Sequence, residues 1–194
     1  MIPLDASTLR MIFDSVYLLA LTAWLGSIVF FSFAIAPLIF QVLDSESAGR
    51  FLRAFFPRYY VWGAVSGALA LPCAVGVPLA FPEHRGPWVG LQAMVIIVAI
   101  LMTLYAVNSL TPAINAARDA GDAGKARFDK LHHRSVMLNG FVLLLLVGLE
   151  IAFVARPRSR TQGIVEPTPV QRAILELNKA AATLPKTPAD SSKP

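Results

Sequence analysis

The sequence predicts an all-α integral membrane protein: a bundle of four spanning helices with a short amphipathic interfacial helix in the first loop and a disordered C-terminal tail. Of the 194 residues, 56% are hydrophobic and only 15% are charged, and the mean hydropathy is +0.60. Soluble domains carry about a quarter charged residues. Four apolar runs explain the difference, because each is long enough to cross roughly 30 Å of hydrocarbon.

The predicted spans are the apolar runs at residues 16–40, 60–81, 89–110 and 135–155. They define a four-pass transmembrane domain over residues 1–155. The first run differs from a signal peptide, because its apolar core is too long and Pro37 follows the small residues at which cleavage would occur. We therefore expect a retained helix and a multi-pass protein of the cell membrane.

Four spans place both termini on one side of the membrane and the loops 41–59 and 111–134 on the other. These loops carry eight Arg and Lys residues close to the span ends, so the positive-inside rule predicts that both loops are cytoplasmic. The pI near 9.7 comes without a nucleic-acid recognition motif. We expect the bilayer, with its anionic headgroups, to be the partner of these basic residues, and no nucleic acid.

The first loop has its own amphipathic pattern. Residues 45–56 place two arginines beside a group of aromatic and aliphatic side chains and end at Pro57, which predicts a short helix lying in the membrane interface. Arg58, Tyr59 and Tyr60 follow as a predicted interfacial anchor, because Tyr and Arg side chains favour the headgroup level.

Residues 156–194 differ in composition from the rest of the chain. Proline, serine, threonine and lysine predominate, which predicts a flexible tail. Within it, Val170, Ile174 and Leu177 recur at helical spacing and predict a short helix over residues 170–184. This helix would contact a partner or the membrane, or form only transiently.

Small residues predict how the spans pack. Gly63 and Gly67 form a GxxxG step, which lets helix backbones approach closely in lipid. We interpret it as a packing seam inside one bundle, and homo-oligomer formation through this seam is the alternative. The single cysteine, Cys73, is interpreted as a packing residue.

A polar stripe runs along the fourth span. Phe128, His132, Ser135, Asn139 and Glu150 fall within about 60° of one another on a helix. Polar groups on a lipid-compatible helix are costly and often functional.

The third span presents Asn108 and Asn115 at the same membrane level as His132. Either the two polar faces fix the helix ends by hydrogen bonds, or they line a small pocket. In such a pocket His132 would act as proton acceptor, ligand or gate.

Glu150 forms a second predicted polar site, because it lies about 27 Å from His132 along the helix axis. An intramembrane carboxylate is a functional hypothesis by default. Its candidate partners on its own side of the membrane are Tyr17, Thr22, His84, Arg85, Gln92 and Arg156.

No motif in the sequence names a reaction. HExxH, CxxC, phosphate-binding glycine loops and nucleophile elbows are all missing. His132 and His133 are adjacent and point about 100° apart on a helix, so they cannot chelate one ion together. The sequence therefore predicts no catalytic and no metal-binding residue, and a cofactor such as haem or copper is kept as an alternative.

Several motifs occur in an order that resembles a known family. They are Ala23-Trp24-Leu25-Gly26, Pro37-Leu38-Ile39-Phe40, Phe56-Pro57-Arg58-Tyr59-Tyr60, residues 108–112, Phe128-x-x-Leu131-His132-x-x-Ser135-x-x-x-Asn139 and Leu149-Glu150. This order is similar to the four-helix membrane family typified by transmembrane protein 205, many of whose bacterial members are labelled as a domain of unknown function. The resemblance implies the architecture over residues 17–155 but no established activity.

That family is also distantly similar to the copper-resistance-D-like membrane superfamily, some of whose members handle copper or haem. The hypothesis that follows is a non-enzymatic membrane protein in small-solute or ion handling or in membrane stress tolerance. The alternatives are a metal- or haem-associated redox membrane protein and a structural or partner-binding membrane protein.

Overall fold

The computed structural model describes residues 6–82, 85–156 and 169–182, and these residues are helical without a β-strand. The chain divides into two units, Met1–Arg156 and Pro157–Pro194. In order, the elements are α1 (Ala6–Phe30), a π-helical turn (Phe31–Ile35), α2 (Ala36–Val42), α3 (Ser45–Ala80), α4 (Pro87–Tyr105), a second π-helical turn (Ala106–Leu110), α5 (Thr111–Asp119), a 3-10 turn (Gly121–Gly124), α6 (Lys125–Val154) and α7 (Pro169–Ala182). The tail segments 157–168 and 183–194, predicted to be flexible, lie outside the described residues.

Four helical stretches among the described residues are long and apolar enough to cross a membrane. They are Ser7–Val42, Ser45–Ala80, Pro87–Asp119 and Gly121–Val154. This confirms the predicted all-α, four-helix membrane fold. Each stretch begins earlier than its predicted span, because helical hydrogen bonding continues into polar residues that a search for apolar runs leaves out.

The amphipathic segment of the first loop is helical but is not a separate helix. The sequence predicts that it ends at Pro57, whereas α3 runs unbroken through this proline into the second span. A proline removes one backbone N–H from the helix. The carbonyl that loses its helical donor at Pro57 is that of Arg53, four residues earlier. In the same turn, the Arg58 guanidinium donates to the carbonyl oxygen of Ala54 at 2.7 Å.

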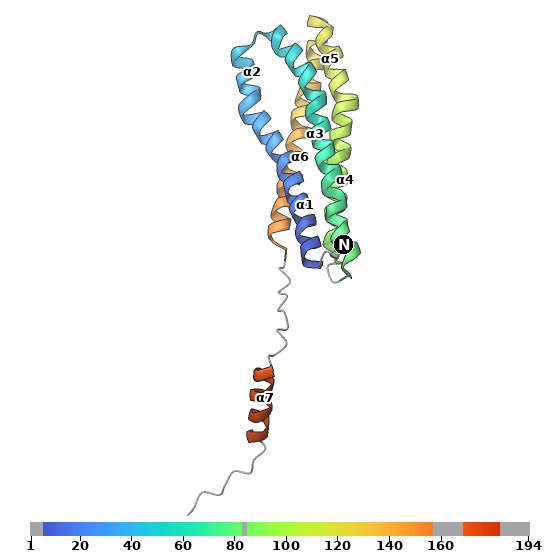
Figure 1. Cartoon of the computed structure of the whole chain (residues 1–194). Helices are drawn as coiled ribbons and strands as arrows, with labels where there is room; N and C mark the ends of the chain where they lie inside the picture. The colour runs from blue at the N-terminus through green and yellow to red at the C-terminus, as the bar shows by residue number, and fades with distance from the viewer. Residues whose placement is uncertain (1–5, 83–84, 157–168, 183–194) are drawn as a thin grey trace, which may run out of the picture. The chain divides into compact units, whose positions relative to one another are not determined.

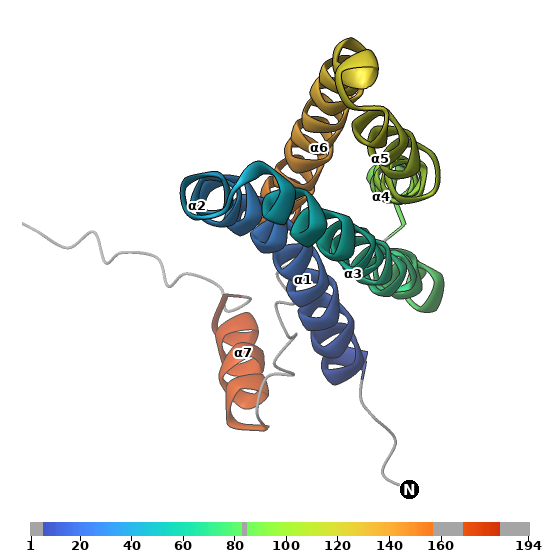
Figure 2. The ribbon, with the colours of Figure 1, turned by 90° about the horizontal axis from the view of Figure 1, so that it is seen from above.

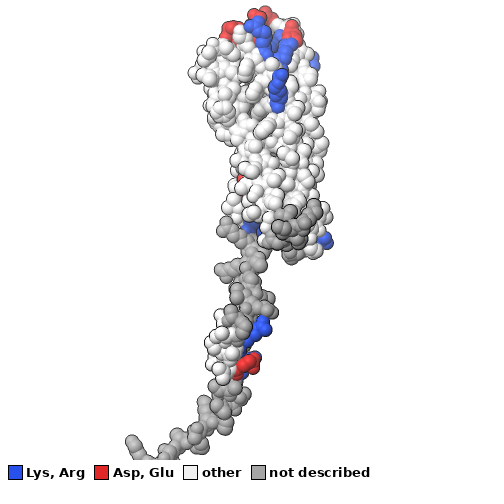
Figure 3. Space-filling view, in the orientation of Figure 1, with Lys and Arg blue, Asp and Glu red and all other residues white. Residues whose placement is uncertain are grey.

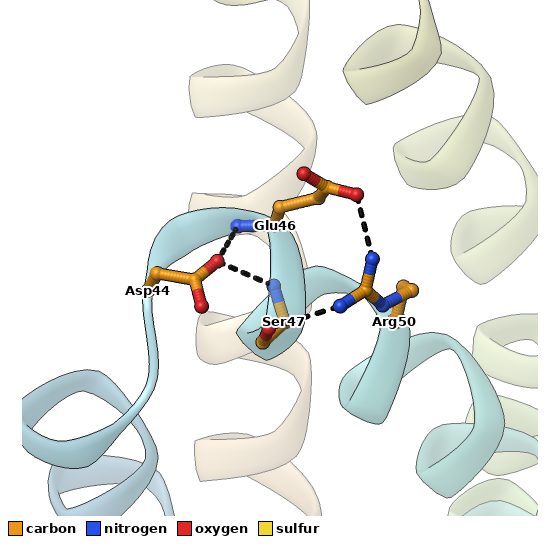
Figure 4. Close-up of polar contacts among 4 residues, drawn as sticks. All are labelled: Asp44, Glu46, Ser47 and Arg50. Carbon is orange, nitrogen blue, oxygen red and sulfur yellow. Dashed lines mark hydrogen bonds and ion pairs between the residues drawn. The ribbon is translucent and has the colours of Figure 1, made fainter.

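The start of α3 is capped by Asp44 (Figure 4). Its carboxylate accepts hydrogen bonds from the backbone N–H groups of Glu46 at 3.0 Å and Ser47 at 2.9 Å. Arg50, one turn later, donates to Glu46 at 2.6 Å and to the Ser47 hydroxyl at 3.0 Å. The two hydrogen bonds to Asp44 satisfy backbone N–H groups that a helix start otherwise leaves unpaired, and they set where α3 begins.

The spanning helices pack as a ring in the order α1, α3, α4 and α6, and α6 closes the ring against α1 (Figures 1 and 2). α5 continues from α4 and packs against α6. The ring encloses a core that includes Leu21, Ile96 and Leu146, each of which is fully buried. Large apolar side chains such as Leu101 and Leu144 are exposed on the outside, as expected where lipid is the solvent.

The GxxxG step of α3 packs inside this bundle. A Cβ atom at Gly67 would lie 2.6 Å from Cγ1 of Ile100 on α4 and 2.8 Å from Cζ3 of Trp24 on α1, and a Cβ atom at Gly63 would also meet the Trp24 indole. Trp24 is therefore seated against α3 only because both positions are glycine. This agrees with the interpretation of a seam within one bundle, and homo-oligomer formation stays a prediction.

Both π-helical turns precede a proline. Pro37 lies two residues after the first turn, and Pro112 lies two residues after the second. Near the second, the Thr111 hydroxyl donates to the carbonyl oxygen of Ala106 at 2.8 Å. A π-turn and a proline both disturb the regular helical hydrogen bonds, and together they are a common cause of a bend. Figure 1 shows that α2 leans away from α6 after the first of these turns.

Charged side chains gather at one end of the bundle, where α2 meets α3 and α5 meets α6 (Figure 3). The two loops predicted to be cytoplasmic meet at this end. Arg53 of α3 pairs with Asp119 of α5 through two hydrogen bonds of 3.2 and 2.5 Å. The loops therefore lie on the same side of the bundle, and their cytoplasmic location stays a prediction.

Candidate functional site

The side chains predicted to form a polar site at this charged end make different contacts, and a shared pocket stays a prediction. The Asn108 amide donates to the carbonyl oxygen of Leu104 at 2.9 Å within its own helical stretch. The Ser135 hydroxyl donates to the carbonyl oxygen of His132 at 2.8 Å within α6. Asn115 is half-buried on α5. A polar side chain in apolar surroundings takes the nearest backbone acceptor, which explains why the two helices do not share these groups.

His132 belongs to a stack of rings and guanidinium at the surface. Its imidazole lies 5.7 Å from the Phe128 ring at an interplanar angle of 4°. The Arg118 guanidinium carbon lies 4.9 Å from the centroid of the same Phe128 ring. Arg118 also packs against Gly49 of α3, so this stack joins α3, α5 and α6. The spacing of Phe128 and His132 indicates this contact, because side chains four residues apart face each other on a helix.

Asn139 is the residue of the predicted site that bridges two helices. The hydroxyl of Tyr59 on α3 donates to Oδ1 of Asn139 on α6 at 2.9 Å. Tyr59 is 8% exposed and Tyr60 is 6% exposed, so these rings lie inside the bundle, whereas Arg58 is exposed. α3 continues through Pro57 and turns both tyrosine rings toward neighbouring helices. The interfacial anchor of Arg58, Tyr59 and Tyr60 stays a prediction.

An aromatic cluster surrounds the Tyr59 ring. The Phe31 ring, at the π-helical turn after α1, lies 4.9 Å from Phe55, 5.4 Å from Phe56 and 5.4 Å from Tyr59. Offset and edge-on ring contacts at these distances are favourable beyond simple apolar burial. The sequence analysis assigned Phe55 and Phe56 to the membrane interface, and it missed that they pack against the first span.

The opposite end of the bundle contains a polar cluster centred on Arg156. Its guanidinium donates to the Asp14 carboxylate on α1 at 3.2 Å and to Oε1 of Gln92 on α4 at 3.1 Å. It also lies over two rings, 5.4 Å from the centroid of Tyr17 and 4.7 Å from that of Phe153. One cation just past the end of α6 thus connects three helices.

Glu150 extends this cluster toward the membrane interior. The Thr22 hydroxyl on α1 donates to Oε1 of Glu150 on α6 at 2.9 Å. Six residues separate Glu150 from Arg156, which is about 9 Å along the helix axis. We call the set of Asp14, Tyr17, Thr22, Gln92, Glu150 and Arg156 the α1–α4–α6 polar cluster.

Tyr17 is the most buried member of this cluster and is 1% exposed. Its ring stacks on Phe153 at 5.5 Å and lies under the Arg156 guanidinium. Among the residues that the structure describes, that hydroxyl has no hydrogen-bond partner. Buried polar groups are nearly always paired, so an orphaned hydroxyl within a cluster of polar and charged side chains needs an explanation.

Two other predicted partners of Glu150 are not placed in the cluster. Arg85 donates to the carbonyl oxygens of Pro78 at 3.0 Å and Leu79 at 3.4 Å, at the end of α3. Beside it lies an open groove of about 350 Å³ between α3 and the start of α4. His84 lies outside the described residues.

Metal binding has no support among the side chains that the structure describes. Within residues 6–82, 85–156 and 169–182, no group of three or more His, Cys, Asp or Glu side chains could hold a metal ion. Haem or copper association stays a prediction.

One family model matches this sequence, over residues 19–123, and its description is a domain of unknown function, DUF4149. The match covers more than half of the chain. The chain belongs to the DUF4149 family. Searches of curated proteins and of solved structures give no match.

The match to DUF4149 includes Thr22, Tyr59 and Gln92, and ends before α6. Asp14, Tyr17, Glu150 and Arg156, the other four members of the α1–α4–α6 polar cluster, lie outside the matched segment. The resemblances to the transmembrane protein 205 family and to the copper-resistance-D-like superfamily stay predictions. This chain is a multi-span membrane protein of the DUF4149 family.

Proposed function

We propose that this protein is a non-enzymatic membrane protein that handles a small polar solute or ion through the α1–α4–α6 polar cluster. The observation that carries the proposal is the buried Tyr17 hydroxyl, which lies among charged residues without a partner. A purely structural cluster would be expected to satisfy this group, because an unpaired buried hydroxyl costs free energy. A bound solute would supply the missing hydrogen bond.

The chemistry of the cluster supports a small polar ligand. Glu150 offers a carboxylate held by Thr22, and it can accept further hydrogen bonds or attract a cation. The positive charge of Arg156 is held in place by its hydrogen bonds to Asp14 and Gln92. A site with both charges and one orphaned hydroxyl suits a ligand that both donates and accepts hydrogen bonds. Charged residues within spanning helices commonly mark such pathways.

The position of the cluster favours exchange with one aqueous side. Arg156 lies two residues after Val154, the last residue of α6, and Glu150 lies about two turns further in. Solute entering from the side of the chain termini would meet Arg156 before Glu150. This is also the end of the bundle opposite to the Arg53–Asp119 pair.

The test begins with a deletion strain screened for growth across metals, drugs and pH, because the solute is unidentified. Any growth defect is then complemented with the wild-type chain and with Tyr17→Phe and Glu150→Gln. Both variants keep the size of the side chain, and they remove the orphaned hydroxyl and the charge, respectively. We expect both to insert normally and to fail to complement.

Matched controls separate this site from the charged end. Tyr105→Phe removes a hydroxyl from a half-buried tyrosine whose ring is covered by the Arg134 guanidinium. His132→Ala removes a residue of the polar site predicted at the charged end. Both are expected to complement. Full complementation by Tyr17→Phe and Glu150→Gln would overturn the proposal.

A direct chemical probe complements the growth assay. Hydrophobic carbodiimides react with carboxyl groups inside membranes, and mass spectrometry locates the modified residue. We expect labelling at Glu150 in purified protein and slower labelling when the solute found in the screen is added. Labelling whose rate is unaffected by that solute would argue against Glu150 as part of its site.

A further inference from the structure

Helix α7 carries an apolar stripe along one face. Val170, Ile174 and Leu177 are 67%, 52% and 68% exposed. Their i, i+4 and i+7 spacing places them on one stripe of the helix, whereas Arg172 and Lys179 fall on the opposite side. Three large apolar side chains on one face of a 14-residue helix indicate that this face packs against another apolar surface.

A helix of this length also needs a partner to be stable. Isolated helices shorter than about 12–15 residues are marginal in water. The ion pair between Lys179 and Glu176 at 3.0 Å adds little, because both side chains are exposed. An apolar surface that accepts Val170, Ile174 and Leu177 would supply the missing stabilisation.

The chain itself keeps the membrane within reach of this face. Twelve residues separate Arg156 from Pro169, and twelve extended residues span at most about 40 Å. α7 therefore begins no further than this from the end of the fourth membrane-spanning helix. Such tethering makes the bilayer surface a high-concentration partner at all times.

Charge complementarity selects the same partner. From Arg156 to the end of the chain there are seven basic and three acidic residues. Juxtamembrane basic residues are attracted to anionic headgroups. An apolar stripe with basic residues on the other face is the pattern of a helix that lies in the plane of the membrane interface.

We propose that α7 docks on the surface of the same bilayer that holds the four spans. Val170, Ile174 and Leu177 enter the boundary between headgroups and acyl chains, and Arg172 and Lys179 face anionic lipid headgroups. This inference is independent of the proposed solute site, because none of these residues belongs to the α1–α4–α6 polar cluster.

The experiment uses the full-length chain with Cys73→Ser, which removes the only native thiol. Leu177→Cys or Lys179→Cys is then labelled with an environment-sensitive fluorophore. These positions are two residues apart but point about 200° apart around the helix, so they form a matched pair. The protein is reconstituted in vesicles of phosphatidylcholine with one quarter phosphatidylglycerol, and in pure phosphatidylcholine.

We expect aqueous iodide to quench the label at position 177 at least threefold less than the label at position 179. Lipids with a quencher on the acyl chain should show the reverse order. The difference should shrink in pure phosphatidylcholine and at 0.5 M salt, which screens headgroup attraction. An added Ile174→Gln substitution should expose the label at position 177.

Two results would overturn the proposal. Equal iodide quenching at both positions in the anionic vesicles would mean that the apolar face stays in water. Protection of position 177 from iodide without quenching by the acyl-chain quencher would mean that protein covers the face. Cross-linking through a cysteine at position 174 would then report whether that protein is a second copy of the chain.

Discussion

The close approach of Trp24 and Ile100 makes Gly67 a sensitive packing position on α3. A Cβ atom added at Gly67 would lie 2.6 Å from Cγ1 of Ile100 and 2.8 Å from Cζ3 of Trp24. Favourable carbon–carbon contacts lie at roughly 3.5–4.0 Å, so Gly67→Ala requires a neighbour to move by about 1 Å. Trp24 has little room to move, because it is 2% exposed and also packs on Gly63.

Overpacking of this kind costs about 1–3 kcal/mol. Replacing glycine by alanine in a helix returns up to about 1 kcal/mol. We therefore expect Gly67→Ala to lower the free energy of unfolding by up to about 2 kcal/mol. Gly148→Ala is the matched control, because Gly148 is also helical and a Cβ atom there would meet nothing within 4 Å.

The assay is unfolding by sodium dodecyl sulfate in mixed micelles, followed by far-ultraviolet circular dichroism. This signal reports helix loss and does not depend on the environment of Trp24. Gly67→Ala should unfold at a lower detergent fraction than wild type, and Gly148→Ala at the same or a higher one. If Gly67→Ala were as stable as Gly148→Ala, the α1–α3–α4 packing described above would be wrong.

Three further predictions concern polar contacts, and the same unfolding assay checks each of them. Tyr59→Phe should lower stability by about 1–3 kcal/mol, because it leaves Oδ1 of Asn139 without its donor; an unchanged unfolding midpoint would contradict this hydrogen bond. The backbone N–H of Ser47, followed by its hydroxyl, holds the pKa of Asp44 below its ordinary value of 3.8. The ionised carboxylate therefore stabilises the fold above that ordinary pKa, and this contribution is lost as the pH falls through the lower pKa of the folded state. The stability difference between wild type and Asp44→Asn should accordingly shrink as the pH is lowered below 3.8, and a difference that does not vary with pH would refute the charged cap. Arg53→Glu should destabilise by placing two carboxylates together, and adding Asp119→Arg should restore most of the loss; failure of the double variant to recover would mean that the pair does not join α3 to α5.

Much of the fold is determined by local sequence patterns. The four spans follow from the length of the apolar runs, because only a helix satisfies every backbone polar group in hydrocarbon. The predicted helix end at Pro57 was wrong, because a proline disturbs only one turn of a helix and α3 continues beyond it. In that turn Arg58 donates to the carbonyl oxygen of Ala54. Helix periodicity also predicted that Phe128 and His132 share a face, and their rings stack.

The candidate site shows where sequence reasoning ends. Helical spacing placed His132, Ser135, Asn139 and Glu150 on one stripe, but spacing within one helix does not say which neighbour faces each residue. Asn139 pairs with Tyr59 of α3, while Ser135 bonds to its own helix. Glu150 was expected to meet one of six residues, and the structure selects Thr22.

The sequence by itself determined that this chain has four helices long and apolar enough to cross a membrane, and that polar residues cluster at two levels of the fourth of them. These properties depend on hydropathy and on the geometry of a single helix. Only the tertiary structure decided that Arg156 joins α1, α4 and α6, and that the hydroxyl of Tyr17 is buried beside it without a partner. Those contacts depend on the order and rotation of helices around the ring, which close packing of side chains such as Trp24 on Gly63 and Gly67 sets.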